Sequence, residues 1–311
     1  MQTPIRIGTR ESQLAVWQAT QVKDLLEKEG FTSELVFIKS EGDIDLKTPL
    51  YEMGVQGVFT RSLDIALLNH KIDLAVHSMK DVPTQLPEGI MQAAVLKRGP
   101  VRDLLVYKND LNFLGATTPA DIATSSIRRK AQWLHKYPTH HLHNLRGNVN
   151  TRLRKLAEES WDGAIFAQAG LERINVRPEK SIVLNWMLPA PAQGAILIAC
   201  RTDDEVSFSC CQPLNDEETA MCTRIERDFL RTLLGGCSTP ISALAEVEEG
   251  DVYFIGELLS LDGRQKVAIE KILPVEKADG LGRDAAEELL EDGGRAIIEG
   301  IKAAEAKIPH A

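Results

Sequence analysis

The chain has 311 residues, of which 43% are hydrophobic and 26% are charged, and its formal net charge is -9. This composition provides apolar material for two or three globular domains, and no run approaches the roughly 18 apolar residues of a membrane-spanning helix. The negative charge argues against nucleic acid as a partner, because phosphate contacts need a basic surface. Any cluster of arginines must therefore serve a smaller anion.

Residues 1–6 lack the charged-then-apolar plan of a signal peptide, so we expect a cytoplasmic protein. The five cysteines are an odd number without zinc-type spacing, which is typical of reduced thiols and predicts no metal site. We interpret Cys210, Cys211 and Cys222 as incidental.

The first hundred residues alternate short apolar runs with helical patterns. Strands are predicted over 5–8, 34–38, 72–76 and 91–96, and helices over 12–29, with Ser12 as a candidate N-cap, and from Phe59. Such βαβ material predicts a parallel or mixed sheet. Residues 39–58 carry three glycines and no apolar period, which is typical of a mobile functional segment or of a disordered one.

Residues 77–83 (HSMKDVP) place reactive side chains directly after a predicted strand. Pro83 prevents simple continuation of a strand or helix, so we expect His77, Lys80 and Asp81 in a turn. Ligands bind at the carboxyl ends of strands in open α/β sheets. A solvated turn in which Asp81 caps a helix fits this heptapeptide about equally well.

The alternation of predicted strands and helices starts again after a crossover at residues 97–100. Strands are predicted over 103–107, 122–124, 140–144 and 162–166, and arginines follow three of the strand-to-helix junctions. The polar residues at these junctions are Thr124, Ser125, Ser126, Arg128, Arg129, Arg146, Arg152 and Arg173. Taken alone, the junction at 124–129 is best explained as a capped helix with two surface arginines. Together they predict a rim that binds carboxylate or phosphate.

A second crossover at residues 188–194 leads into a strand, 195–200, that we expect to return to the first sheet. After residue 215 come a long helix, a glycine pair before Cys237, three antiparallel strands (242–247, 252–259, 266–272) and one or two helices (278–291, 294–306). We therefore predict two hinged, doubly wound α/β domains resembling periplasmic binding proteins, 1–98 with 195–212 and 99–194. A C-terminal α+β domain, 213–311, should carry an antiparallel three-stranded sheet.

Seven motifs resemble, in the same order, those of the porphobilinogen deaminase (hydroxymethylbilane synthase) family. They are Arg10-Glu11-Ser12, His77-Ser78-Met79-Lys80-Asp81-Val82-Pro83, Thr124-Ser125-Ser126-Ile127-Arg128-Arg129, Leu145-Arg146-Gly147-Asn148, Ala169-Gly170-Leu171, Gln193-Gly194-Ala195 and Gly235-Gly236-Cys237. Each motif is weak alone, and the resemblance rests on their number and order.

The resemblance implies a transferase of tetrapyrrole biosynthesis. Such an enzyme condenses four porphobilinogens head to tail with loss of ammonia and releases hydroxymethylbilane from a dipyrromethane cofactor, which a thioether joins to the residue matching Cys237. Asp81 matches the catalytic carboxylate. The matched cofactor-binding residues are Cys237, Lys80, Asp81, Thr124, Ser125, Ser126, Arg128, Arg129, Arg146 and Gly147. The matched substrate-binding residues are Arg10, Ser12, Arg152, Arg173 and Gln193. The expected partners are porphobilinogen and oligopyrrole intermediates, bound by a monomer with no membrane or nucleic acid.

The chain departs from the family pattern in a few places. Val55-Gln56-Gly57 stands where a Gly-Lys-Gly type turn is common, Arg61 replaces a lysine, and Ala123 and Ala192 replace glycines. Two other readings stay open. One is a non-catalytic hinged binder of a small anion, against which Cys237 and the absence of a signal peptide weigh. The other is a cysteine-dependent transferase for a different substrate, although a lone cysteine is usually an inert small hydrophobe.

Overall fold

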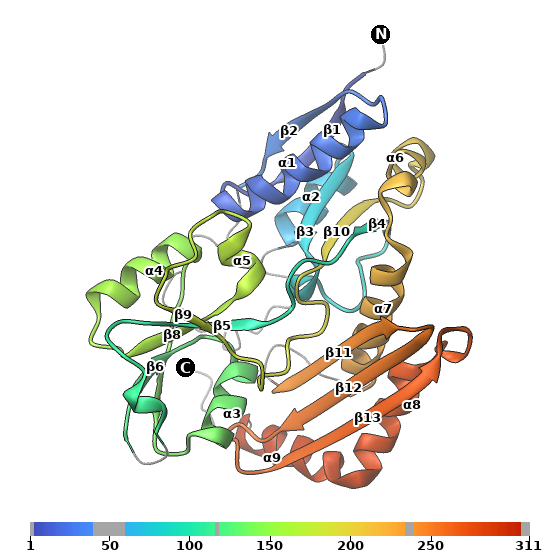
Figure 1. Cartoon of the computed structure of the whole chain (residues 1–311). Coiled ribbons are helices and arrows are strands. Elements are labelled where there is room, and N and C mark those ends of the chain that lie inside the picture. The colour runs from blue at the N-terminus through green and yellow to red at the C-terminus, as the bar shows by residue number, and fades with distance from the viewer. Residues whose placement is uncertain (1–2, 40–59, 116–117, 234–238, 306–311) are drawn as a thin grey trace.

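The computed structural model describes residues 3–39, 60–115, 118–233 and 239–305. Its three sheets occupy three parts of the molecule (Figure 1). The predictions made for the 39–58 segment, apart from Lys39 itself, and for Cys237 lie outside the described residues.

The first sheet has the strand order β2-β1-β3-β10-β4, and β10 is antiparallel to both of its neighbours. Its strands are β1 (Ile5–Thr9), β2 (Ser33–Phe37), β3 (Leu74–Ser78), β4 (Ile90–Leu96) and β10 (Ile196–Arg201). Its helices are α1 (Gln13–Lys28), α2 (Arg61–Leu68) and α6 (Glu205–Cys211). The mixed sheet and the returning strand are confirmed. The short helix α6 was not predicted.

The helix α1 forms where its local sequence predicts a helix. Ser12 accepts a hydrogen bond from the backbone N–H of Ala15 at 3.4 Å, as an N-cap does, and Ala19, Val22 and Leu26 form a buried stripe. The predicted cap and helix are confirmed.

The second sheet has the order β7-β6-β8-β5-β9. Its strands are β5 (Asp103–Tyr107), β6 (Asp121–Ala123), β7 (His141–His143), β8 (Gly163–Ala167) and β9 (Ser181–Val183). Its helices are α3 (Ile127–Lys136), α4 (Val149–Glu158) and α5 (Gln168–Glu172). The predicted strand 103–107 is confirmed in both bounds. The strand β9 was missed because three residues are too few to show an alternating period.

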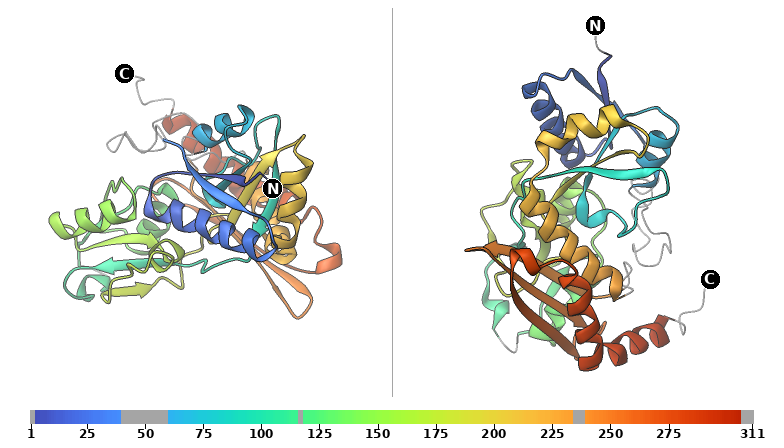
Figure 2. Two further views of the ribbon diagram at one scale, coloured as in Figure 1. Left: turned by 90° about the horizontal axis from the view of Figure 1, so that it is seen from above. Right: turned by 90° about the vertical axis from the view of Figure 1, so that its right-hand side faces the viewer.

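The third sheet is the predicted antiparallel meander of β11 (Ile241–Glu248), β12 (Asp251–Leu259) and β13 (Lys266–Pro274). It packs with α7 (Glu217–Thr232), α8 (Leu281–Leu289) and α9 (Arg295–Glu305). Phe229 of α7 meets Phe254 of β12 with ring centroids 5.2 Å apart. The helix α7 also contacts β4, so it reaches from the third sheet to the first, as the right-hand view of Figure 2 shows.

Single-turn helices complete the described part of the chain. They are η2 (Met79–Asp81), η3 (Asn112–Leu114), η4 (Gln212–Leu214), η5 (Val275–Lys277) and the π-type turn η6 (Leu290–Gly294).

The two crossovers between the first and second sheets lie against each other. The N–H of Gly99 donates to the carbonyl of Gly194 at 3.0 Å. Gly194 has a φ of +89°, and a Cβ there would come within 2.6 Å of the Gly99 oxygen, so only glycine fits this crossing.

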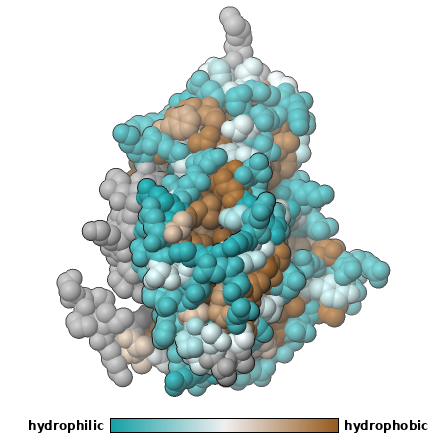
Figure 3. Space-filling model, turned by 60° about the vertical axis from the view of Figure 1, so that its left-hand side comes forward, coloured by the Kyte–Doolittle hydropathy of each residue, from teal (hydrophilic) through white to brown (hydrophobic). Residues whose placement is uncertain are grey.

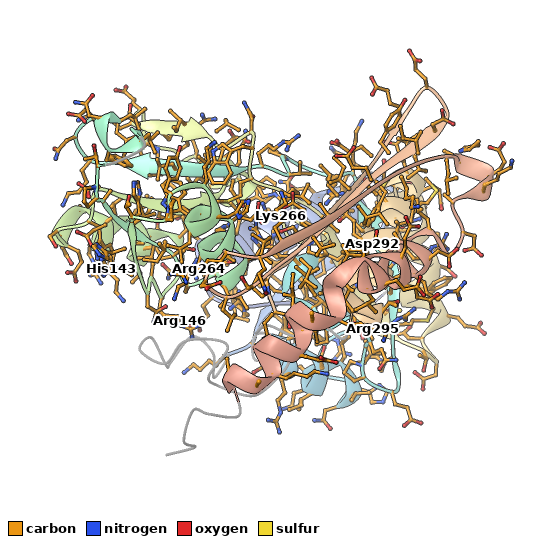
Figure 4. All side chains as sticks on the ribbon, turned by 90° about the horizontal axis from the view of Figure 1, so that it is seen from below. His143, Arg146, Arg264, Lys266, Asp292 and Arg295 are labelled. Carbon is orange, nitrogen blue, oxygen red and sulfur yellow. The ribbon has the colours of Figure 1, made fainter. Side chains whose placement is uncertain are left out.

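The helix α3, which belongs with the second sheet, also contacts the third sheet. Gln132 of α3 donates to the hydroxyl of Ser242 at 2.8 Å, and a ring nitrogen of His135 lies 2.7 Å from the Gly263 carbonyl. Figure 4 shows Arg264 and Lys266 beside this junction. On the face drawn in Figure 3, apolar patches lie between rows of hydrophilic residues.

Candidate functional site

The candidate site begins in the turn that follows β3. Ser78 ends the strand, and Met79, Lys80 and Asp81 form the single turn η2, which we call the Asp81 turn. Met79 is buried and anchors this turn, Lys80 is half-buried and Asp81 is exposed. The predicted position of Lys80 and Asp81 in a turn directly after a strand is confirmed.

The prediction for His77 was wrong. The strand β3 continues through Ser78, and His77 is paired with Leu197 of β10 inside the sheet. Burial, with a smaller contribution from Arg10, lowers the pKa of His77 to about 4. His77 is therefore neutral near pH 7.

Asp103 lies at the centre of the cationic residues, although sequence reasoning did not single it out. Its fully buried carboxylate accepts hydrogen bonds from Arg128 at 2.8 Å on one oxygen and from Arg129 at 2.8 Å on the other. Burial by itself raises the pKa of Asp103, but the two guanidinium groups outweigh burial and hold that pKa well below its usual range. The available signal was a carboxylate opening an otherwise apolar strand.

Gln193 of the second crossover connects Asp103 to Lys80. Its amide nitrogen donates to Asp103 at 2.9 Å, and its amide oxygen accepts from the Lys80 ammonium at 3.2 Å. Burial and then Arg129 lower the pKa of Lys80 to about 8, while Asp81 and Asp103 oppose the shift. The structure thus brings together predicted residues that lie on three distant segments.

Two further arginines join this group, Arg146 from the segment before α4 and Arg152 from the first turns of α4. Arg152 donates through Nε to the Gly147 carbonyl at 2.7 Å. Burial lowers the pKa of Arg152 to about 10, with Arg129 and Arg146 adding to the effect and Asp81 opposing it, so these charges lie close together. We call the five positive side chains the cation cluster: Lys80, Arg128, Arg129, Arg146 and Arg152.

Gly147 is required by the backbone beside this cluster. Its φ is +114°, and a Cβ there would come within 2.6 Å of the Thr151 side chain. Figure 4 shows Arg146 on the same side of the molecule as His143, well away from Asp292 and Arg295.

The hydroxyl groups predicted at this site are engaged with the backbone. Ser126 caps α3 by accepting from the Arg129 N–H at 3.4 Å, and Thr124 accepts from the Ser126 N–H at 3.2 Å. Ser125 donates to the Leu145 carbonyl at 2.7 Å. The capped helix is confirmed, and a role of these residues toward a ligand stays a prediction.

The remaining predicted residues are spread over the edge of the site. Arg10 lines a small hollow together with His77, Ser78 and Asp81, whereas Ser12 caps α1. Arg173 stands apart from the cation cluster: its guanidinium donates to the Gly194 carbonyl at 2.6 Å and lies 5.6 Å from the Trp17 ring centroid. It ties the second crossover to α1.

The donor set fits a ligand that carries several carboxylates. The buried Nε atoms of Arg128 and Arg129 have no hydrogen-bond partner among the described residues, and an unsatisfied buried donor is costly. The five cations of the cluster outnumber the carboxylates that act on them in the described part of the chain, which are Asp81, Asp103 and Glu257. Guanidinium groups match carboxylates in charge and geometry.

Within the described residues, no group of three or more His, Cys, Asp or Glu is arranged to hold a metal ion. None of the helices in the described part of the chain has the length and apolarity to cross a membrane.

The fold and the site together define the class of this protein. It is a mixed α/β protein in which two crossovers join two sheets, and the exposed carboxylate of Asp81 lies near the cation cluster. Two family models place the chain more closely. "Porphobilinogen deaminase, dipyromethane cofactor binding domain" matches residues 5–208, and "Porphobilinogen deaminase, C-terminal domain" matches residues 220–291. This chain belongs to the porphobilinogen deaminase family.

Curated relatives agree with the family models. The porphobilinogen deaminase of Pelobacter propionicus is 41% identical over 299 residues, which cover 95% of this chain and 96% of the relative. That of Chlorobium phaeobacteroides is 38% identical over 310 residues, covering 97% and 99%. Among solved structures, a nutrient binding protein from Burkholderia cenocepacia bound to methionine is 16% identical, with a TM-score of 0.42 over 69% of this chain and 93% of that one. A similarity that weak says nothing about the ligand.

Proposed function

We propose that this chain condenses four porphobilinogen molecules head to tail on a covalently bound dipyrromethane, with loss of ammonia at each step, and releases hydroxymethylbilane. The observation that carries this proposal is the exposed Asp81 carboxylate within electrostatic range of the cation cluster. Membership of the porphobilinogen deaminase family supports the substrate.

The substrate's chemistry explains this combination of charges. Porphobilinogen carries an acetate and a propionate, so each added ring brings two carboxylates that need cationic partners. Loss of ammonia leaves a positively charged methylene-pyrrolenine, and a fixed carboxylate in a partly desolvated site stabilises that charge better than water does. Asp81 fills this role, and it accepts hydrogen bonds from pyrrole N–H groups. Arg10, Ser12, Arg152, Arg173 and Gln193 would bind the incoming substrate.

The dipyrromethane, when bound, supplies the pyrrole carbon that takes up the next ring. Its carboxylates would be held by the orphaned donors of Arg128 and Arg129, with the side chains and backbone groups around them. The other residues proposed to hold it are Lys80, Asp81, Thr124, Ser125, Ser126, Arg146 and Gly147.

Cys237 is the proposed attachment point for this group. The other four cysteines are free and buried, and burial raises the pKa of Cys200 to about 11 and that of Cys222 to about 12. The thiolates of Cys200 and Cys222 are therefore disfavoured at neutral pH, and a thiolate is the nucleophilic form. We further propose that the protein is a cytoplasmic monomer. Its three proposed domains are 1–98 together with 195–212, 99–194, and 213–311.

The mass of the intact, active protein tests this proposal. We expect the bare chain plus two pyrrole units, located on Cys237 by peptide mapping. Cys237→Ser should lose both the added mass and turnover, while Cys222→Ala should keep both. A bare mass in active protein would refute the covalent primer. Anion binding without turnover would favour the hinged binder, and an added group of another mass would favour a transferase for a different substrate.

A further inference from the structure

Two adjacent residues of α7 hold different parts of the site. Glu226 is fully buried, and its carboxylate forms a two-pronged ion pair with Arg98 of the first crossover at 2.6 and 2.9 Å. The same carboxylate accepts from the backbone N–H of Ala192 in the second crossover at 2.6 Å and from that of Ala245 in β11 at 2.8 Å. One side of α7 therefore fixes both crossovers to the third sheet.

The next residue, Arg227, binds the Asp81 turn. One terminal nitrogen of its guanidinium donates to the carbonyls of Met79 at 3.3 Å and Val82 at 3.0 Å, and the other donates to the carbonyl of Pro83 at 2.6 Å. These three carbonyls lie on both sides of Lys80 and Asp81 in the chain. Arg227 is thus an external brace for a turn that otherwise has one backbone hydrogen bond of its own, from the Val82 N–H to the Met79 carbonyl.

The chemistry of Arg227 suits a brace rather than a ligand-binding group. Burial lowers its pKa to about 10, with Arg231 adding to the effect and Asp228 opposing it, so the side chain still carries its charge near neutral pH. Both terminal nitrogens are already engaged with carbonyl oxygens. A planar guanidinium can hold several carbonyls in a fixed relation, which the ammonium of a lysine cannot reproduce.

We propose that Arg227 is a positioning residue for the reaction, which orients the Asp81 carboxylate by fixing the carbonyls on either side of it. This inference rests on the proposed function, since it assigns Arg227 a role through Asp81. The brace comes from the helix that directly precedes the Cys237 segment in the chain. Arg227 therefore sets the relation between the part that carries the proposed attachment point and the acid that acts on each new ring.

The test compares Arg227→Gln and Arg227→Lys with Arg224→Gln in the holoenzyme. Arg224 lies on the same helix and is exposed, and its charge partner Asp279 is 3.9 Å away. We expect Arg227→Gln to lower kcat roughly 10- to 100-fold per cofactor-bearing molecule, because small misplacements of a catalytic group cost that much. KM should stay within about twofold of wild type, since the cation cluster is untouched. Arg227→Lys should recover part of kcat, and Arg224→Gln should change neither constant.

Intact mass separates this inference from the function on which it rests. If wild-type protein lacks the added pyrrole units, the proposed function fails first. If wild type carries them, an unchanged kcat in Arg227→Gln overturns the positioning role. A fall in activity that disappears when rates are divided by the cofactor-bearing fraction overturns it equally, because Arg227 then serves only folding or assembly. Should Arg227→Gln fail to fold, a full wild-type kcat in Arg227→Lys overturns it.

Discussion

Replacing Asp103 by asparagine tests the buried centre of the site most directly. The substitution keeps size and shape but removes the negative charge that two guanidinium groups share, each at 2.8 Å. The arginine side chains are only 6% exposed and the carboxylate is 0% exposed, so water cannot replace the lost partner. Removing one partner of a buried ion pair costs about 3–5 kcal/mol. Two charge-assisted hydrogen bonds at about 1.5–3 kcal/mol each sum to about 3–6 kcal/mol, which overlaps that range.

We therefore expect Asp103→Asn to lower the free energy of unfolding by about 3–5 kcal/mol at pH 7, a large part of the roughly 5–15 kcal/mol that stabilises a domain. Hydrogen exchange followed by mass spectrometry is the suitable assay, because a chain of several units need not unfold in one step. Amides of β5 and β8 should exchange faster in the variant, and those of the third sheet should change much less. Asp110→Asn is the matched control, since Asp110 is exposed and accepts from the N–H of the nearby Asn112. Its effect should stay within about 0.5 kcal/mol.

The pH dependence provides a second check on Asp103. Its pKa is lowered in the folded state, so its stabilising contribution is complete above the unfolded pKa of about 3.9 and is lost as pH falls through the lower folded value. The stability gap between wild type and Asp103→Asn should narrow as pH falls below about 4, and it should also change toward pH 8, because Asp103 helps to keep Lys80, with its pKa of about 8, protonated. A gap smaller than about 1 kcal/mol at pH 7, or one that Asp110→Asn reproduces, would refute the reasoning.

Three further predictions concern the site. Asp81→Ala should keep the covalent adduct but lose about 10²–10³ in kcat, as removal of one preorganised charge-stabilising group does; near-normal turnover would assign the chemistry to another residue. Arg128→Leu and Arg129→Leu should impair cofactor attachment, whereas Arg10→Leu should carry the adduct yet stall on incoming substrate. Intact mass distinguishes a failure of attachment from a failure of elongation. Normal attachment and elongation in all three variants would contradict the proposed carboxylate binding. The pKa of His77 is lowered in the folded state to about 4 from 6.5. The free energy of unfolding should therefore fall by at most about 3 kcal/mol as pH drops from 6.5 toward 4. If the free energy of unfolding of a His77→Gln variant falls equally steeply with pH over that range, other groups cause the loss of stability.

Much of this protein could be predicted because its signals are local. The helix α1 was predicted from the Ser12 cap and a stripe of apolar residues, and the strand β5 was predicted from a short apolar run. The turn with Lys80 and Asp81 was recognisable because it follows an apolar strand and precedes a proline. The family motifs likewise consist of neighbouring residues, so their order along the chain was enough to suggest the reaction.

Tertiary structure alone decided how these segments meet. Asp103, Arg128 and Gln193 are far apart in sequence, and only folding shows that a chain carboxylate already occupies part of the predicted arginine rim. His77 was misplaced because pairing with β10, a strand more than a hundred residues later, extends β3 through it. The role proposed for Arg227 depends on its contacts with the Asp81 turn, which lies more than a hundred residues earlier in the chain. Short-range patterns determine where helices, strands and turns form. Burial, pKa values and hydrogen-bond partners depend on long-range contacts that one-dimensional periodicity does not encode.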